Sequence, residues 1–118
     1  MSYKEIITFL GTKDLKKTSL FYKNILGLTL YKDQGICQIF NITSGAKIGF
    51  CTHMSVDIKD RNPIITLVTE DVDKMYDKIV KAGVVIPKTP EFNKKFNIYH
   101  FFLKDPNGYT LEIQKFLD

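Results

Sequence analysis

Two stretches of the chain place apolar side chains every three or four residues, which is the spacing of one helix face. The first covers residues 14–26, with the capping residue Asp14 at its start and Gly27 after its end. The second lies between the capping residue Asp71 and Gly83. Most other apolar segments are short and rich in β-branched or aromatic residues, which favours strands. We predict strands at residues 4–12, 28–32, 36–42, 46–52, 64–69, 84–86, 98–103 and 109–116.

The order of the predicted elements occurs twice. The first strand and helix of the two halves align without gaps at an offset of 57 residues, and the last strands align at an offset of 63. The first alignment places Ile7, Leu10, Thr12 and Asp14 against Ile64, Leu67, Thr69 and Asp71, and the second places Gly45, Ile48 and Phe50 against Gly108, Leu111 and Ile113. Each half is a strand-helix-strand-strand-strand unit, so we infer a duplication.

A single unit of this kind has a sheet with a helix on one face and nothing on the other. Two units placed together can form a cupped mixed sheet with the two helices outside and the uncovered faces lining a cavity. We therefore predict an α+β fold built from two tandem βαβββ units. The 118 residues suit one domain, residues 1–118, with a first repeat at 4–52 and a second at 63–117.

The last strand follows a tight turn, Asp105-Pro106-Asn107-Gly108. After this turn, apolar side chains alternate with polar ones, which is the pattern of a strand with one apolar face. Glu112 lies on the polar face of that strand. In the predicted fold this face lines the cavity, so the pattern places a carboxylate there.

Charge and composition narrow the classes of partner. The formal net charge of +4 comes from 17 basic and 13 acidic residues, and the lysines are scattered rather than arranged in a stripe. We therefore expect no nucleic-acid partner. No apolar run reaches the roughly 18 residues of a membrane helix, so we expect no membrane partner. The first residues lack a signal-peptide layout, which favours a cytoplasmic protein with Cys37 and Cys51 as reduced thiols.

Two motifs resemble a known family. The early one is Asp14-Leu15-x-x-x-Ser19-x-Phe21-Tyr22-x-x-Ile25-Leu26-Gly27-Leu28, and the late one is Asp105-Pro106-Asn107-Gly108-x-x-Leu111-Glu112-Ile113. With the duplicated unit, they resemble the vicinal oxygen chelate superfamily, which includes glyoxalase I, the extradiol dioxygenases and the bleomycin-resistance proteins. The resemblance covers nearly the whole chain. It implies the glyoxalase/bleomycin resistance/dioxygenase fold, a ligand cavity and a homodimer.

The resemblance also implies where a divalent metal would be held. Enzymes of this family use one His, Gln or Glu side chain from each of four strands. Carried over by motif, the four positions are Ile7, Gly49, Ile64 and Glu112, so Glu112 is the only family ligand retained. A metal site needs several converging donors. We therefore expect no metal and no cofactor, and the catalytic residues stay unknown.

Strand parity gives the residues expected to line the cavity and bind a ligand: Phe9, Cys37, Cys51, His53, Thr66, His100, Phe102 and Glu112. His100 and Glu112 are either an acid–base pair or a buried carboxylate satisfied by its neighbours. A metal held by the two histidines, Glu112 and a cysteine is a further alternative. Each cysteine is either a nucleophile or a small buried hydrophobe.

Three hypotheses of function follow. In the first, the chain is a metal-free protein that binds an apolar or aromatic small molecule in the cavity. In the second, it is a metal-dependent glyoxalase-like lyase or dioxygenase with substituted ligands. In the third, it is an interaction module that uses a dimer surface. We favour the first, because most of the predicted cavity is apolar and aromatic with a few polar groups.

Overall fold

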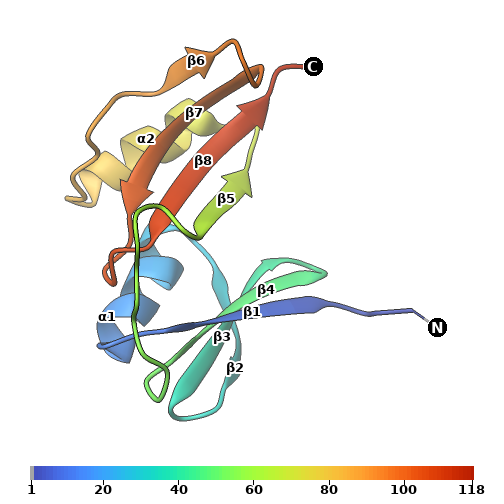
Figure 1. The fold of residues 1–118 in the computed structure, drawn as a ribbon, viewed down its shortest axis with the longest axis vertical. Helices are drawn as coiled ribbons and strands as arrows, with labels where there is room; N and C mark the ends of the chain where they lie inside the picture. The colour runs from blue at the N-terminus through green and yellow to red at the C-terminus, as the bar shows by residue number, and fades with distance from the viewer. Residues whose placement is uncertain (1) are drawn as a thin grey trace. The chain divides into compact units, whose positions relative to one another are not determined.

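The computed structural model describes residues 2–118, which form two compact units (Figure 1). The first unit ends at Asp57 and the second runs from Ile58 to Asp118, so the boundary lies in the polar segment between the two repeats. Each unit has the element order βαβββ. The predicted α+β fold of two tandem βαβββ units is thereby confirmed. No helix within residues 2–118 is long and apolar enough to cross a membrane.

The first unit contains a four-stranded sheet and one helical segment. Its elements are β1 (Ile6–Gly11), α1 (Leu15–Leu20), the π-helical turn η1 (Phe21–Ile25), β2 (Thr29–Asp33), β3 (Cys37–Thr43) and β4 (Ala46–Cys51). The strand order is β1-β4-β3-β2, with β1 and β4 parallel and the other pairs antiparallel. Asp14 caps α1 by accepting a hydrogen bond from the Lys17 amide at 3.0 Å, as the sequence predicts.

Aromatic packing fills the core of the first unit. The Tyr22 ring lies 4.6 Å from the Phe50 ring and 6.3 Å from the Phe40 ring, measured between centroids. All three side chains are buried. The helical segment therefore covers one face of the sheet through β3 and β4 and leaves the other face uncovered by its own helix.

The second unit repeats this plan with different side chains. Its elements are β5 (Ile64–Val68), α2 (Val72–Lys81), β6 (Glu91–Asn93), β7 (Ile98–Lys104) and β8 (Thr110–Phe116). The strand order is β5-β8-β7-β6, and β5 and β8 are parallel. Ile79 of α2 and Leu111 and Ile113 of β8 are buried, and Tyr76 packs edge-on against Phe101 at 5.4 Å.

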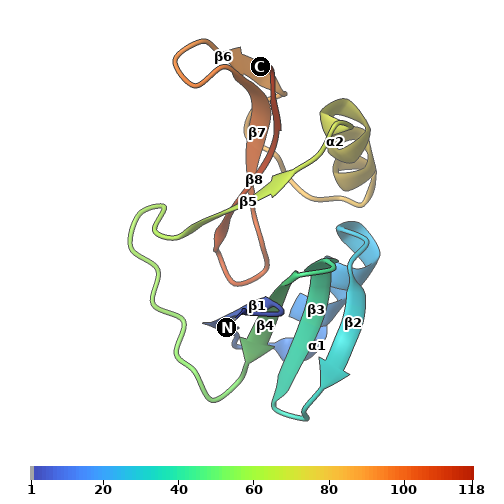
Figure 2. The same cartoon turned by 90° about the vertical axis from the view of Figure 1, so that its right-hand side faces the viewer.

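The strand predicted at residues 84–86 is wrong. These residues form no strand, and Val85 is 86% exposed. The edge strand of the second sheet is instead β6, which lies within a stretch predicted as a loop. Glu91 pairs with His100 and Asn93 with Ile98, so a short hairpin places β6 beside β7 (Figure 2). A polar three-residue edge strand has too little apolar periodicity to be predicted from sequence.

The turn before β8 is confirmed and fixes where that strand begins. The Asp105 carboxylate accepts hydrogen bonds from the amides of Asn107 and Tyr109, each at 2.9 Å. Gly108 has a φ of 95°, which a side chain would disfavour. Four residues after this glycine, Glu112 lies in the middle of β8, on the face opposite α2.

Strand register shows that Gly49 and Glu112 occupy equivalent positions. In the first sheet Gly49 of β4 lies between Phe9 of β1 and Ile39 of β3. In the second sheet Glu112 lies between Thr66 of β5 and Phe102 of β7. The offsets of 57 and 63 residues relate these two triplets, so the repeat seen in the sequence holds at the level of individual strand pairs.

Candidate functional site

The face of each sheet that its own helix leaves uncovered is called here the open face. The open face of the second sheet carries Thr66, His100, Phe102 and Glu112, four of the residues predicted to bind a ligand. All four lie on adjacent strands, with Glu112 in the central position. The structure therefore brings these four together within one unit.

The Glu112 carboxylate is the centre of a polar cluster in which Glu112, His100 and Gln114 are buried and Thr66 is exposed. Its Oε1 accepts a hydrogen bond from the Thr66 hydroxyl at 2.8 Å, and its Oε2 lies 2.7 Å from His100 Nδ1. In the amide orientation that satisfies both groups, the Gln114 nitrogen donates to both carboxylate oxygens at 3.2 Å. The side chains of His100 and Glu112 are 9% and 11% exposed. We call these four residues the Glu112 cluster.

The hydrogen bond from His100 to Glu112 sets the direction of the imidazole. An ionised carboxylate can only accept, so the hydrogen in this contact belongs to Nδ1. The other ring nitrogen, Nε2, has no hydrogen-bond partner among residues 2–118. In the neutral ring it can accept a hydrogen bond, and in the charged ring it can donate one. His100 also lines the adjoining cavity.

A cavity of about 460 Å³ lies against the Glu112 cluster, and we call it the Glu112 cavity. It is lined by Arg61, Ile64, Asn93, Phe96, Ile98, His100, Phe102, Glu112, Gln114 and Phe116. The Arg61 guanidinium lies 4.4 Å from the centre of the Phe102 ring, so a cation stands beside the aromatic wall. A second hollow of about 300 Å³ shares Arg61, His100 and Phe102 and extends to Lys88.

The open face of the first sheet is filled differently. A Cβ atom added to Gly49 would lie 2.6 Å from two carbons of the Phe9 ring. The ring of Phe9 therefore occupies the space where Glu112 has its side chain in the second unit. Phe9 is 40% exposed, so its outer edge remains accessible.

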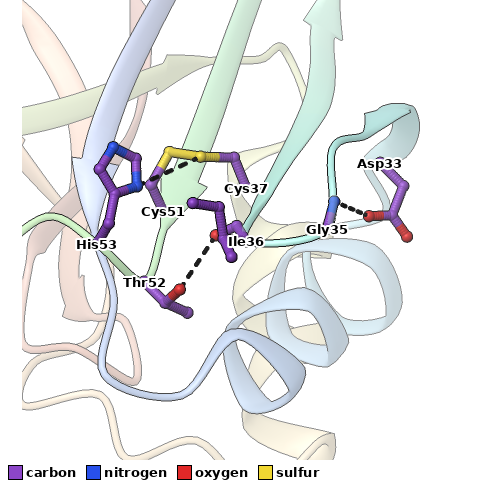
Figure 3. The surroundings of a disulfide bond; sticks show 7 residues. All are labelled: Asp33, Gly35, Ile36, Cys37, Cys51, Thr52 and His53. Carbon is purple, nitrogen blue, oxygen red and sulfur yellow. Dashed lines mark hydrogen bonds between the residues drawn. A yellow bond between two sulfur atoms is a disulfide. The ribbon is translucent and has the colours of Figure 1, made fainter.

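The other three predicted residues of the first unit come together at the end of this face. Cys37 and Cys51 are directly paired across β3 and β4, with their Cα atoms 4.1 Å apart, and they form a disulfide (Figure 3). His53 Nδ1 lies 3.9 Å from Cys37 Sγ. The expectation of reduced thiols is therefore wrong for this structure. Because the two side chains share a face and a register position, their sulfur atoms meet.

Sequence reasoning missed three polar residues on or beside the open faces. Gln114 follows Glu112 by two positions, so strand parity could have found it. Lys47 precedes Gly49 by two positions and is buried, with its Nζ 3.3 Å from Glu5 and 4.5 Å from the centre of the Tyr31 ring. Arg61 lies in the loop before β5, where no periodic pattern places a side chain.

The family's four metal-ligand positions are divided between the two units. In the first, Ile7 pairs with Lys47 and Gly49 is covered by the Phe9 ring. In the second, Ile64 offers only hydrocarbon, and both oxygens of Glu112 already accept hydrogen bonds. An isoleucine side chain and a glycine supply no donor atom. The residues at these four positions therefore do not fit the family's metal.

Comparison with known proteins gives the class. The model of the Glyoxalase/Bleomycin resistance protein/Dioxygenase superfamily matches residues 6–113, and the chain belongs to that superfamily. A search of curated proteins by sequence found no match.

Solved structures show the same fold at low sequence identity. A glyoxalase/bleomycin resistance protein/dioxygenase family enzyme from Burkholderia phytofirmans matches with a TM-score of 0.79 and 21% identity, over 94% of this chain and 97% of that one. A lactoylglutathione lyase from Agrobacterium tumefaciens matches with a TM-score of 0.73 and 18% identity, over 93% and 91%. A virulence protein of Salmonella typhimurium matches with a TM-score of 0.74 and 19% identity, over 99% and 100%.

Proposed function

We propose that this chain is a small-molecule-binding member of its superfamily that works without the family's metal centre. The ligand is apolar or aromatic and lies in the Glu112 cavity against Phe102. His100 Nε2 provides a hydrogen bond to the ligand. The observation that carries the proposal is the Glu112 cluster, because a carboxylate with two satisfied oxygens positions His100 instead of holding a metal.

The size and lining of the cavity support this proposal. About 460 Å³ lies within the range of small-molecule sites, and the lining combines aromatic and aliphatic side chains with a few polar groups. Arg61 adds a positive charge beside the Phe102 ring. The ligand class that suits this arrangement is therefore a flat apolar molecule, with an anionic group directed at Arg61.

Two fluorescent probes test this site without knowledge of the natural ligand. 8-Anilinonaphthalene-1-sulfonate is aromatic and anionic, whereas N-phenyl-1-naphthylamine has the same rings without the charge. Both are titrated into the full chain, oxidised and free of added metal. We expect saturable binding of both probes, with Arg61→Gln weakening the sulfonate more than the neutral amine.

Phe102→Ala should weaken both probes about tenfold, which corresponds to a loss of about 1.4 kcal/mol. The matched control is Phe92→Ala. Phe92 is 70% exposed, lies on β6 and packs on Tyr99 at 4.6 Å without lining the Glu112 cavity. Equal affinities for the two variants would contradict the proposed site.

Elemental analysis of the same oxidised protein tests the metal-free part of the proposal. We expect less than a tenth of a divalent ion per chain, whereas about one ion that is lost in Glu112→Gln would favour a metal-dependent lyase or dioxygenase. A homodimer and a cytoplasmic location stay predictions. Sedimentation equilibrium checks the first, and cell fractionation checks the second.

A further inference from the structure

The open face of the first unit carries a second cluster of chemically active side chains. Cys37 Sγ, Cys51 Sγ and His53 Nδ1 all lie within 4.8 Å of one another. We propose that these three residues form a redox-gated site for a thiophilic divalent cation, with Zn²⁺ as the reference ion. The site is closed while the cysteines form a disulfide and opens when they are reduced.

The spacing of the donor atoms supports a tetrahedral site. Zn–S bonds of about 2.3 Å and Zn–N bonds of about 2.0 Å place a sulfur and a nitrogen ligand roughly 3.5 Å apart, and two sulfur ligands roughly 3.8 Å apart. Cys37 Sγ and His53 Nδ1 are already 3.9 Å apart. All three donor atoms lie within 4.8 Å of one another, so after reduction small side-chain rotations can separate the two sulfur atoms and bring His53 into range of both.

The local structure holds the three ligands in place. The two cysteines are buried on paired strands, so the backbone keeps their side chains on one face. His53 follows β4 by two residues and is exposed, and its ring lies beside the sulfur atoms (Figure 3). A cation can enter from the exposed side of His53. Three protein ligands leave the fourth tetrahedral position open to water or another molecule.

A dithiol can serve as the reductant that opens the site. The dithiol transfers two electrons and two protons to the Cys37–Cys51 bond and becomes a disulfide itself, which leaves two protein thiols. Zn²⁺ then displaces both thiol protons into solvent and binds the two thiolates and His53. None of the three residues stands at a metal-ligand position implied by the family. The site is therefore independent of the ligand proposed for the Glu112 cavity.

The test uses Co²⁺ as a spectroscopic substitute for Zn²⁺. The full chain is reduced with a phosphine, which takes an oxygen atom from water as the protein disulfide gains two electrons and two protons. The phosphine is removed without air, and Co²⁺ is added, followed by Zn²⁺. We expect about one Co²⁺ per reduced chain, with thiolate-to-metal charge-transfer absorption that disappears when Zn²⁺ displaces the cobalt. The oxidised chain should show neither signal.

Variants assign the signal to the three ligands. His53→Gln should weaken cation binding by at least about tenfold, and Cys51→Ser should abolish the thiolate absorption of the reduced chain. The matched control is His100→Gln, which removes the other histidine and should leave the signal unchanged. Equal binding by oxidised and reduced wild-type protein would overturn the proposal, and so would a signal that depends on His100. The comparison of oxidised and reduced wild-type protein tests the redox dependence of cation binding even if a cysteine variant fails to fold.

Discussion

The two open faces have the same backbone and different contents. At equivalent register positions, the first sheet has Gly49 and the second has Glu112. In the first sheet, the Phe9 ring covers Gly49, and the Cys37–Cys51 disulfide lies two residues further along β4. In the second, the carboxylate organises Thr66 and His100 beside a cavity of about 460 Å³.

This difference shows that the residue at one register position decides which side chains a βαβββ unit has on its open face. A glycine lets a neighbouring ring lie flat on the sheet and fill the space with hydrocarbon. A glutamate at the same place requires partners, because a buried carboxylate without hydrogen bonds is strongly destabilising. Glu112 then lines the cavity together with its partners His100 and Gln114, and both of its carboxylate oxygens are already hydrogen-bonded. Duplication therefore supplied two scaffolds, and side-chain substitution gave them different chemistry.

The largest effect is expected from removing the carboxylate. Glu112→Ala leaves the Thr66 hydroxyl and His100 Nδ1 without their acceptor; His100 is buried whereas Thr66 is exposed, so most of the cost comes from the imidazole. We expect the free energy of unfolding to fall by about 2 kcal/mol, measured by urea denaturation. Glu112→Gln keeps the shape and an acceptor oxygen, so its loss should stay below about 1 kcal/mol.

A control separates this cluster from general effects of charge. Glu91→Ala removes an exposed carboxylate from β6, and its effect should lie within about 0.5 kcal/mol. If Glu112→Ala were no more destabilising than Glu91→Ala, the hydrogen bonds of the Glu112 cluster would not stabilise the second unit. The proposed difference between the two open faces would then be contradicted.

The next prediction tests whether the Phe9 ring fills the space above Gly49 on the open face of the first sheet. In Gly49→Ala the new Cβ meets the Phe9 ring at 2.6 Å, so the ring must swing outward. Because the ring is partly exposed and can move, we expect a loss of only about 1 kcal/mol of unfolding free energy. Gly45→Ala is the matched control, since its Cβ would meet nothing closer than the Lys4 carbonyl oxygen at 3.8 Å.

A double-mutant cycle sharpens this result. In a Phe9→Ala background, Gly49→Ala has no ring to displace and should be neutral or slightly stabilising, because glycine weakens a strand interior. The coupling between the two positions should therefore be about 1 kcal/mol. Additive effects of the two substitutions would show that Phe9 does not occupy the space above Gly49.

The sequence predicted the fold because each unit combines a segment of helical periodicity with period-two strands, and because the repeat fixes their order. Of the two predicted capping residues, Asp14 caps its helix, whereas the Asp71 side chain makes no capping hydrogen bond. It placed Glu112 on an open face through strand parity alone. It could not predict β6, whose three residues have no apolar alternation. The pairing of Cys37 with Cys51 was accessible, since counting outward from Ile42 and Ala46 across the turn brings these two positions together. Arg61 could not be predicted, because the conformation of a loop follows from tertiary contacts.

The smallest effect concerns how each helix is attached to its sheet. In the first unit the buried hydroxyls of Thr12 and Thr18 lie 2.8 Å apart, whereas in the second unit the exposed Tyr99 hydroxyl donates to Asp73 at 2.5 Å. This hydrogen bond raises the pKa of Tyr99 above its usual value of 10.0, with desolvation and the charge of Asp73 acting in the same direction.

The raised pKa of Tyr99 means that the folded state holds the phenolic proton more tightly than the unfolded chain does. The contribution of the pair to stability is therefore present below about pH 10 and is lost as the pH rises through the folded pKa.

Asp73→Asn removes the negative charge and should bring the pKa of Tyr99 back toward 10.0. The measurement is the ultraviolet absorbance of tyrosinate as a function of pH, with Tyr99→Phe used to identify the Tyr99 contribution among the six tyrosines. Asp77→Asn, one turn later on α2, removes the same charge from the helix without touching this hydrogen bond and should leave the titration of Tyr99 nearly unchanged. If both asparagine variants shifted the pKa equally, the general charge of α2 would be the cause. The attachment of the second helix would then not depend on the specific contact that distinguishes it from the first.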